Sequence, residues 1–213
     1  EHINAELAKK NVYWDCYNGF RSLAKEELLA DTFEEVEEMF YSSQYRNHVE
    51  SQNQRNEKNR HPERNRTTSD LLKNKKTAPE ETIFQIGTID NHVPPEILLQ
   101  VVTDFLVELD TRFGKNVHIL DWALHLDEGT PHIHERHVFD CENSYGEVAP
   151  QQEKALEELG FELPDPTQKP SKINNRKKTF DSVCRVILFN ITKKYGLDLE
   201  EEPEYGGRAY LEK

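Results

Sequence analysis

The chain has 213 residues, 35% of them hydrophobic, and carries a formal net charge of −13. This length can bury one sizeable core, so we predict a single domain over residues 1–213. No apolar run reaches the roughly 20 residues that span a bilayer, no signal peptide is visible, and three scattered cysteines cannot form a disulfide framework. We therefore expect a cytoplasmic protein with no membrane contact, and because the first residue is Glu1 we expect a fragment of a longer product.

The charge is distributed unevenly along the chain. Between Arg46 and Lys76 there are nine Lys and Arg and four acidic residues, a local net charge of +5, whereas residues 169–178 hold five positive residues and no acidic one. An evenly spread negative charge would oppose nucleic-acid binding, because phosphates have to be neutralised by Lys and Arg. The two basic segments are therefore either arms that contact nucleic acid or solvated loops, and charge alone leaves both interpretations open.

The N-terminal part of the chain predicts a strand followed by two helices. Residues 11–16 are rich in β-forming side chains, and residues 21–30 and 32–49 show helical patterns. The second helix opens with a capping box, in which Thr32 is the N-cap and Glu35 is its partner. Four apolar residues are expected to form its buried stripe: Phe33, Val36, Met39 and Phe40.

A long polar segment follows this helix. Residues 50–70 contain no strongly apolar side chain, so they cannot contribute to a core. They are either an exposed extension of the helix as far as Pro62 or a flexible arm. We define residues 46–80 as the basic arm and predict a strand over residues 82–89 after it.

The clearest elements lie in the second half of the chain. Residues 95–113 form a helix that begins with Pro95 and ends before Gly114. Two alternating segments, residues 116–127 and 130–139, predict a β-hairpin around the turn sequence DEG.

A short helix that ends at Gly160, a Pro/Lys-rich loop over residues 162–178 and an amphipathic helix over residues 176–196 complete the prediction. Together these elements indicate an α+β fold with four or five strands. We expect an antiparallel β-sheet around the hairpin to carry a metal site, with helices packed on one of its faces.

Four of the nine histidines lie within residues 125–137, whose sequence is HLDEGTPHIHERH. Side chains alternate along a strand, so His132 and His134 share a face, and pairing through the turn would bring His125 beside them. Three imidazoles at one point suit a divalent transition-metal ion and leave a coordination position open for water or substrate. Two histidines on one strand are often only exposed polar residues, but a third histidine and a carboxylate in the turn favour a metal site.

Other charged residues surround the three histidines. Glu128 in the turn could be a fourth ligand, a hydrogen-bond acceptor for an imidazole or a proton acceptor, and it is our catalytic candidate. Arg136 shares the histidine face and could contact a phosphate. His137 and His118 have the opposite alternation and are set aside, the latter as a structural residue.

The stretch HLDEGTPHIH, from His125 to His134, resembles the third motif of the Mob/Pre plasmid mobilisation and recombination proteins, the MobV-type relaxases of the HUH endonuclease superfamily. The HIH within it resembles the histidine, hydrophobe, histidine signature of that superfamily. A second segment, INAELAKKN at residues 3–11, resembles the family's Ile-Asn segment just before a strand. The resemblance covers roughly residues 1–140, only the first motif is specific, and from Glu135 onward the sequence departs from the family's apolar continuation.

The resemblance implies a relaxase that nicks one DNA strand at a plasmid or mobile-element origin of transfer, bound as single-stranded or hairpin DNA. It implies that His125, His132 and His134 hold a divalent metal ion (Mn, Mg or Zn) that polarises the scissile phosphate, with Glu128 as an acidic neighbour. A His or Tyr side chain would attack the phosphate and form a covalent adduct. The family's nucleophile lies upstream of the INAELAKKN match, so we expect it before Glu1 and expect no adduct from these 213 residues.

Several residues within the chain are candidates for DNA contacts. Four tyrosines are alternative nucleophiles: Tyr13, Tyr17, Tyr41 and Tyr45. Tyr13 is more simply a core residue, and Tyr41 and Tyr45, which could stack on bases, are more simply a packing pair. Seven basic residues are expected to contact phosphates: Arg64, Arg66, Lys75, Lys76, Arg136, Lys177 and Lys178.

Two functions of other kinds remain open from the sequence. One is a metal-dependent hydrolase of another phosphoester, in which Glu128 activates a bound water. The other is a non-catalytic DNA-binding module in which the metal only staples the hairpin.

Overall fold

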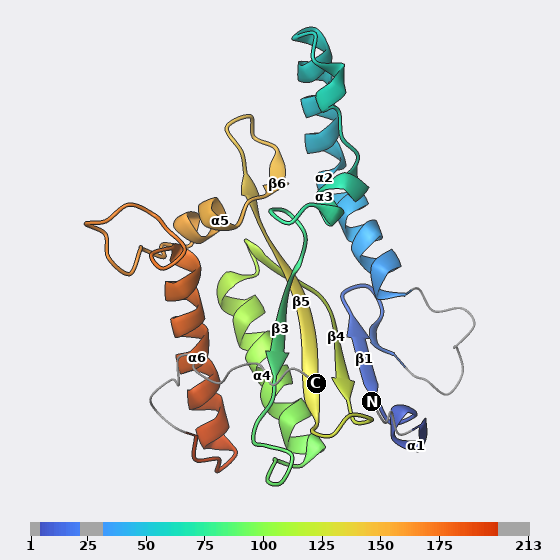
Figure 1. Cartoon of the computed structure of the whole chain (residues 1–213), viewed down its shortest axis with the longest axis vertical. Coiled ribbons are helices and arrows are strands. Elements are labelled where there is room, and N and C mark those ends of the chain that lie inside the picture. The colour runs from blue at the N-terminus through green and yellow to red at the C-terminus, as the bar shows by residue number, and fades with distance from the viewer. Residues whose placement is uncertain (1–4, 22–31, 200–213) are drawn as a thin grey trace.

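The computed structural model of the chain describes residues 5–21 and 32–199. Its centre is an antiparallel sheet of six strands with the order β2-β1-β4-β5-β3, and β6 pairs with the far end of β5 (Figure 1). The predicted α+β class with an antiparallel sheet is confirmed, although the short strands β2 and β6 were not predicted. The helix predicted over residues 21–30 lies outside the described residues except for Arg21, which ends β2.

Helices and strands are mixed along the described part of the chain. The strands are β1 Val12–Asp15, β2 Gly19–Arg21, β3 Glu80–Phe84, β4 Val117–His125, β5 His132–Glu142 and β6 Val148–Pro150. The helices are α1 Ala5–Ala8, α2 Phe33–Lys58, α3 Thr68–Lys73, α4 Pro95–Phe113, α5 Gln152–Glu158 and α6 Arg176–Lys194, and a 3-10 turn spans Pro62–Arg64. None of these helices combines the length and apolarity that crossing a membrane requires.

The larger hydrophobic core lies between one face of the sheet and helices α4, α5 and α6. Strands β4 and β5 contribute Trp122, Leu124 and Ile133 to it, and α4 contributes a buried stripe between Leu98 and Leu109. Burying a large apolar side chain contributes about 1.5–3 kcal/mol. This core therefore fixes the two strands that carry the histidines.

Helices also cover part of the other face, so the prediction that helices pack on one face only is wrong. A smaller core places Tyr41, Tyr45 and Val49 of α2 against Leu120 and Val138 of the sheet. The sequence pattern did not show this core because the residues that α2 buries include Glu37 and two tyrosines. Since α2 packs at the end of the face that contains Leu120 and Val138, the histidine end remains partly exposed.

Helix α2 begins at the predicted capping box. The Thr32 hydroxyl accepts a hydrogen bond from the backbone N–H of Glu35, whose carboxylate accepts one from the backbone N–H of Thr32. The helix continues to Lys58, which confirms the helical extension rather than the flexible arm. Met39 is 39% exposed, so its assignment to the buried stripe is wrong.

The outer part of α2 and the segment that returns from it, residues 46–77, form a prong that projects beyond the sheet (Figure 1). Within the prong, the Asn53 side chain makes two hydrogen bonds to the backbone of Arg66, at 2.8 and 2.9 Å. Arg55, also in the prong, donates two hydrogen bonds at 2.6 and 2.9 Å to Glu147, which lies outside it. The prong is therefore held both to its own return segment and to the β5–β6 connection.

A β-bulge in β4 decides which side chains share a face. The pairing of β4 with β5 skips Leu120, so the alternation of β4 reverses across that residue. His118 pairs with Val138 of the smaller core and therefore lies on the same face as His125, so the opposite alternation predicted for it is wrong. Its Nε2 atom lies 2.8 Å from Oδ1 of Asp140, which holds it at the end of the face away from His125.

Candidate metal centre

Three histidines meet at the partly exposed end of the sheet. His125 is the last residue of β4, and it pairs with His132, the first residue of β5; His134 follows on the same face. The ring centroids are 5.0–5.4 Å apart in all three pairs. The structure thus brings together the three side chains that the sequence singled out as metal ligands.

Each of these imidazoles has an oxygen acceptor beside its Nδ1 atom. For His132 it is the backbone carbonyl two residues earlier, at 2.8 Å, and for His134 it is Oε1 of Glu81, at 3.0 Å. For His125 it is Oδ1 of Asp127, at the longer distance of 3.7 Å. Carbonyl and carboxylate oxygens only accept hydrogen bonds, so these contacts favour a proton on Nδ1 and a free lone pair on Nε2.

The donor set suits a divalent metal ion in chemistry, but its spacing is slightly too wide to hold one. Three imidazoles bound through Nε2 at about 2.0–2.1 Å hold their ring centroids roughly 4.5–5.2 Å apart, slightly less than the spacing in the structure. Oxygen acceptors on the second ring nitrogen are the usual partners of metal-binding histidines. Among residues 5–21 and 32–199 no group of three or more His, Cys, Asp or Glu side chains can hold an ion as it stands, so the rings would have to move inward to bind one.

The electrostatic surroundings favour a neutral imidazole and an ionised carboxylate. Burial, together with the neighbouring imidazoles of His132 and His134, lowers the pKa of His125. A hydrogen bond from the Asn11 amide lowers the pKa of Asp127. Metal binding requires these protonation states, because a protonated ligand has no lone pair to offer.

Glu128 lies in the turn between β4 and β5 with 59% of its side chain exposed. Its Oε2 atom is 3.8 Å from Nε2 of His132, the nitrogen that the contact at Nδ1 leaves free. The carboxylate therefore lies at the open edge of the centre. From there it can accept a proton or approach a bound ion.

Strand β1 and the residue before it add two polar side chains to the histidine face. Asn11 donates to Oδ1 of Asp127 at 2.9 Å and accepts, at 2.8 Å, the backbone N–H that follows His125, so it fixes the end of β4. Tyr13 pairs with Ala123 in the sheet, and its hydroxyl lies 3.4 Å from Nδ2 of Asn11. Because Ala123 carries only a methyl group, no bulky side chain of β4 separates the phenol ring from the histidines.

Sequence reasoning assigned Tyr13 to the core and did not consider Glu81. The structure makes Tyr13 half-buried, with its hydroxyl directed along β1 toward Asn11. Glu81 lies on β3, which pairs with β5, and nothing in the sequence showed that these two strands are neighbours. The available signal was the pair of glutamates directly before the predicted strand, Glu80 and Glu81.

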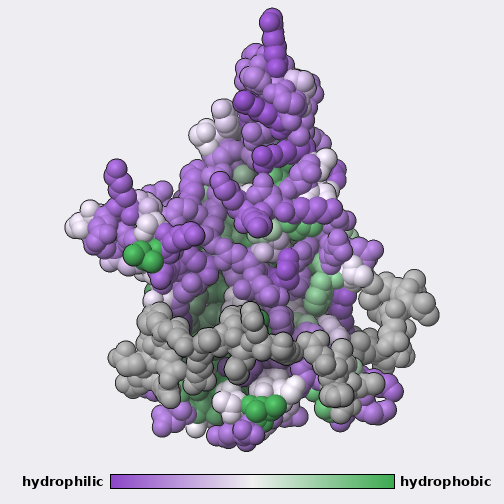
Figure 2. Space-filling view, viewed as in Figure 1, coloured by the Kyte–Doolittle hydropathy of each residue, from purple (hydrophilic) through white to green (hydrophobic). Residues whose placement is uncertain are grey.

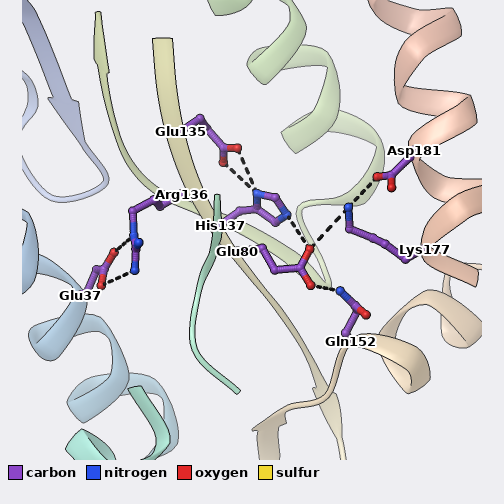
Figure 3. Close-up of polar contacts among 8 residues, drawn as sticks. All are labelled: Glu37, Glu80, Glu135, Arg136, His137, Gln152, Lys177 and Asp181. Atoms are coloured by element: carbon purple, nitrogen blue, oxygen red, sulfur yellow. Dashed lines mark hydrogen bonds and ion pairs between the residues drawn. The ribbon is translucent and has the colours of Figure 1, made fainter. Parts of the chain in front are cut away.

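Arg136 is on the histidine face but is engaged in an ion pair. Its Nε and Nη2 atoms donate to the carboxylate of Glu37 from α2, the second contact at 3.1 Å (Figure 3). Asp121, which pairs with Arg136 across the sheet, is 1% exposed, and its Oδ2 atom has no hydrogen-bond partner. Arg136 thus compensates the buried Glu37 carboxylate, and the phosphate contact predicted for it would require it to leave Glu37.

The opposite face of β5 carries a separate polar network (Figure 3). His137 contacts the carboxylate of Glu135 at 3.0 and 3.2 Å, and its Nε2 atom is 3.9 Å from Oε2 of Glu80. Lys177 of α6 lies 3.4 Å from the same oxygen and 2.5 Å from Asp181. Burial lowers the pKa of His137, but the carboxylates of Glu135 and Glu80 together outweigh burial and raise it. Lys177, a predicted phosphate contact, is therefore occupied within this network.

The other predicted phosphate contacts lie on exposed surfaces. Arg64 and Arg66 are in the prong, Lys75 and Lys76 follow α3, and Lys178 lies in the first turn of α6. Figure 2 shows that hydrophilic side chains cover the projecting tip of the prong. None of these residues adjoins the three histidines in sequence or in strand pairing, so a ligand that contacts both would have to be extended.

Two further tyrosines have structural positions. Tyr41 and Tyr45 are fully buried, and their rings pack edge to face with centroids 4.9 Å apart. Their hydroxyls donate to the carbonyl oxygen of Thr77 and to Asp140. They form the packing pair that the sequence favoured and cannot stack on bases.

The cysteines are also unsuited to nucleophilic chemistry. Burial raises the pKa of Cys16 and Cys141 to about 11 and that of Cys184 to about 12. These thiols therefore stay protonated near neutral pH.

Comparisons with known proteins found no relative. No family model, no curated protein and no solved structure matches the chain. The likeness to the Mob/Pre proteins therefore stays a prediction from the sequence motifs.

Proposed function

We propose that this protein is a metal-dependent DNA-nicking enzyme of the relaxase type, which acts on single-stranded or hairpin DNA at an origin of transfer. The observation that carries the proposal is the convergence of His125, His132 and His134, each with an oxygen acceptor at Nδ1. These residues would hold a divalent ion such as Mn, Mg or Zn. When bound, such an ion supplies Lewis-acid chemistry at a phosphate oxygen.

The residues around the histidines position them and handle protons. Glu81 and Asp127 favour the Nδ1-protonated form of two of the imidazoles, and Asn11 keeps the Asp127 carboxylate in place. Glu128, exposed at the edge of the centre, is the group that can exchange a proton with solvent.

As an alternative to the nucleophile that the family resemblance implies upstream of Glu1, Tyr13 is our candidate for the attacking hydroxyl within these residues. It lies on the histidine face, and its hydroxyl is turned toward Asn11, whose side chain bonds to the backbone directly after His125. Attack would form a bond between the phenol oxygen and phosphorus and break the bond to the 3′ oxygen of the DNA. The phenol proton would pass to Asp127 or to water, and the 3′ oxygen would take a proton from solvent.

DNA is favoured over a small phosphoester by the resemblance of HLDEGTPHIH to a relaxase motif and by the charge of the prong. Exposed arginines and lysines in residues 46–77 form a basic surface on an otherwise acidic chain. Such a surface attracts a polyanion and contributes little to binding a single phosphate monoester.

Cleavage of a labelled pool of random-sequence single-stranded oligonucleotides, with and without Mn²⁺, tests the proposal. We expect metal-dependent cleavage that His134→Ala abolishes and that His61→Ala leaves intact, because His61 lies in the prong and is 46% exposed. Equal activity in the presence of a chelator, or equal loss in both variants, would contradict the proposal.

The role of Tyr13 needs a covalent readout. We expect an oligonucleotide adduct on the peptide that contains Tyr13, lost in Tyr13→Phe and kept in Tyr17→Phe. Tyr17 is a suitable control because it is 49% exposed and its hydroxyl contacts the Ser43 hydroxyl at 3.3 Å. Metal-dependent cleavage that survives Tyr13→Phe with no adduct would assign the attack to water and make the protein a hydrolase. An adduct that requires residues upstream of Glu1 would assign the attack to a group outside this chain.

A further inference from the structure

The connection between β5 and β6 exposes a single aromatic ring that the turn does not need. Tyr145 is 67% exposed. The turn is built by its neighbours: the Asn143 side chain accepts the backbone N–H groups of Tyr145 and Glu147 at 2.8 and 3.1 Å, and Gly146 supplies the positive φ of 73°. Any side chain would fit at position 145, so the aromatic ring has no role in forming the turn.

One face of this ring is covered by a fixed cation. The guanidinium of Arg55, from α2, lies 4.1 Å from the ring centroid. Two hydrogen bonds from Arg55 to Glu147, at 2.6 and 2.9 Å, hold the guanidinium over the ring. The ring is therefore preorganised, because the Arg55 side chain that packs on it is already held in place by Glu147.

The surroundings of the ring are polar rather than apolar, and their basic residues lie on the prong, whereas the charged residues of 140–160 are mostly acidic. Within residues 46–77 and 140–160, all of which the structure describes, Tyr145 is the only strongly exposed large hydrophobic residue. A protein partner would require a contiguous apolar patch at the centre of its interface, which this region lacks. Exposed cations of the adjoining prong, including Arg60, Arg64 and Arg66, instead provide contacts for phosphates.

We infer that Tyr145 and Arg55 form a stacking platform for an unpaired base of single-stranded DNA, with the prong contacting the neighbouring phosphates. Base-on-aromatic stacking with an arginine nearby is a common way to bind single strands without reading their sequence. The inference rests on DNA being the ligand of the proposed function but uses a different surface. β5 separates the platform from the histidines, and its 11 residues span about 35 Å. The platform would thus hold a segment of the strand distant from the site of cleavage.

Binding of a fluorescein-labelled oligothymidine to the full 213-residue chain in a chelating buffer, measured by anisotropy, tests the platform without cleavage. We expect Tyr145→Ala to weaken binding about 5- to 150-fold, the range of one stacked base. Tyr145→Phe should bind like the unmodified protein, because it keeps the ring. Tyr17→Ala, which removes another half-exposed tyrosine, is the matched control and should also bind normally. The thermal midpoint of Tyr145→Ala verifies that the fold is retained.

Two further measurements separate stacking from charge. Because stacking involves no phosphate, the slope of log affinity against log salt should be the same in Tyr145→Ala, whereas Arg64→Gln with Arg66→Gln should flatten it. A fully paired duplex of the same length should bind equally to Tyr145→Ala and to the unmodified protein. Unchanged oligothymidine affinity in Tyr145→Ala, an equal loss for the duplex, or an equal loss in Tyr145→Phe would overturn the inference. The proposed cleavage is measured with metal present and fails or survives independently of these results.

Discussion

Asp121 is a buried carboxyl group whose ionisation the fold opposes. It is 1% exposed, and its Oδ2 atom has no hydrogen-bond partner. Burial and the nearby carboxylate of Glu37 raise the pKa of Asp121 to about 8, against the opposing effect of Arg136. We predict that replacing it by Asn makes the stability of the protein less dependent on pH.

The size of the effect follows from proton linkage. In the unfolded chain the carboxyl titrates near its ordinary value of 3.8, whereas in the folded protein it keeps its proton up to about 8. Because the raised pKa means that the folded state binds the proton more tightly, the stabilisation is complete below the unfolded pKa and is lost as pH rises through the folded pKa. Between these values the contribution of Asp121 to the free energy of unfolding falls by about 1.4 kcal/mol per pH unit, or about 3 kcal/mol from pH 5 to pH 7.

Asp121→Asn keeps the shape of the protonated acid and removes the titration. We expect the variant to be equal to or less stable than the unmodified protein near pH 5, where its extra amide hydrogen lacks an acceptor, and to gain on it steadily as pH rises. Urea unfolding at several pH values and constant ionic strength measures the difference, in which all other titrating groups cancel. Asp90→Asn, at an exposed position, is the control and should show no trend. A difference between Asp121→Asn and the unmodified protein that stays constant from pH 5 to pH 8 would refute this account of Asp121.

Three other outcomes are expected. Glu81→Gln should weaken metal binding about 10- to 100-fold in a competition titration while leaving the metal-free thermal midpoint unchanged, since it alters only the acceptor at Nδ1 of His134. Glu147→Gln should lower the free energy of unfolding by about 1–3 kcal/mol in urea, because it weakens the charged hydrogen bonds that hold Arg55; an unchanged urea midpoint would mean that the prong is held elsewhere. Leu156→Ala, at a site of 0% exposure, should cost about 2–5 kcal/mol, and a smaller loss would show that α5 contributes little to the core.

The elements with strong periodicity could be predicted from the sequence. The helix that starts at Pro95 and the capping box at Thr32 lie where the patterns placed them. Strands β2 and β6 contain three residues each, too few for alternation to be visible. The second face of helix packing was missed because the residues that α2 buries include Glu37, Tyr41 and Tyr45, which a hydrophobic pattern does not count.

The candidate centre was predictable only where strand alternation determines it. His132 and His134 are two residues apart on one strand, and a short turn brings His125 opposite them. Alternation failed for His118, because the extra residue in β4 cannot be recognised before the pairing of the strands is known. Glu81 and the hydroxyl of Tyr13 come from β3 and β1, whose positions beside the hairpin are set by the sheet as a whole.

The alternation of β5 also limits how this protein can change in length. Its even-numbered residues from His132 to Asp140 face one side of the sheet, and its odd-numbered residues face the helices of the larger core. Insertion or deletion of one residue within the strand would exchange the two sets, exposing Glu135 and His137 and driving His134 beneath α4. Single substitutions can therefore accumulate on one side without disturbing the other, whereas viable insertions near β5 should fall in the turns that flank it, at residues 126–131 and 143–147.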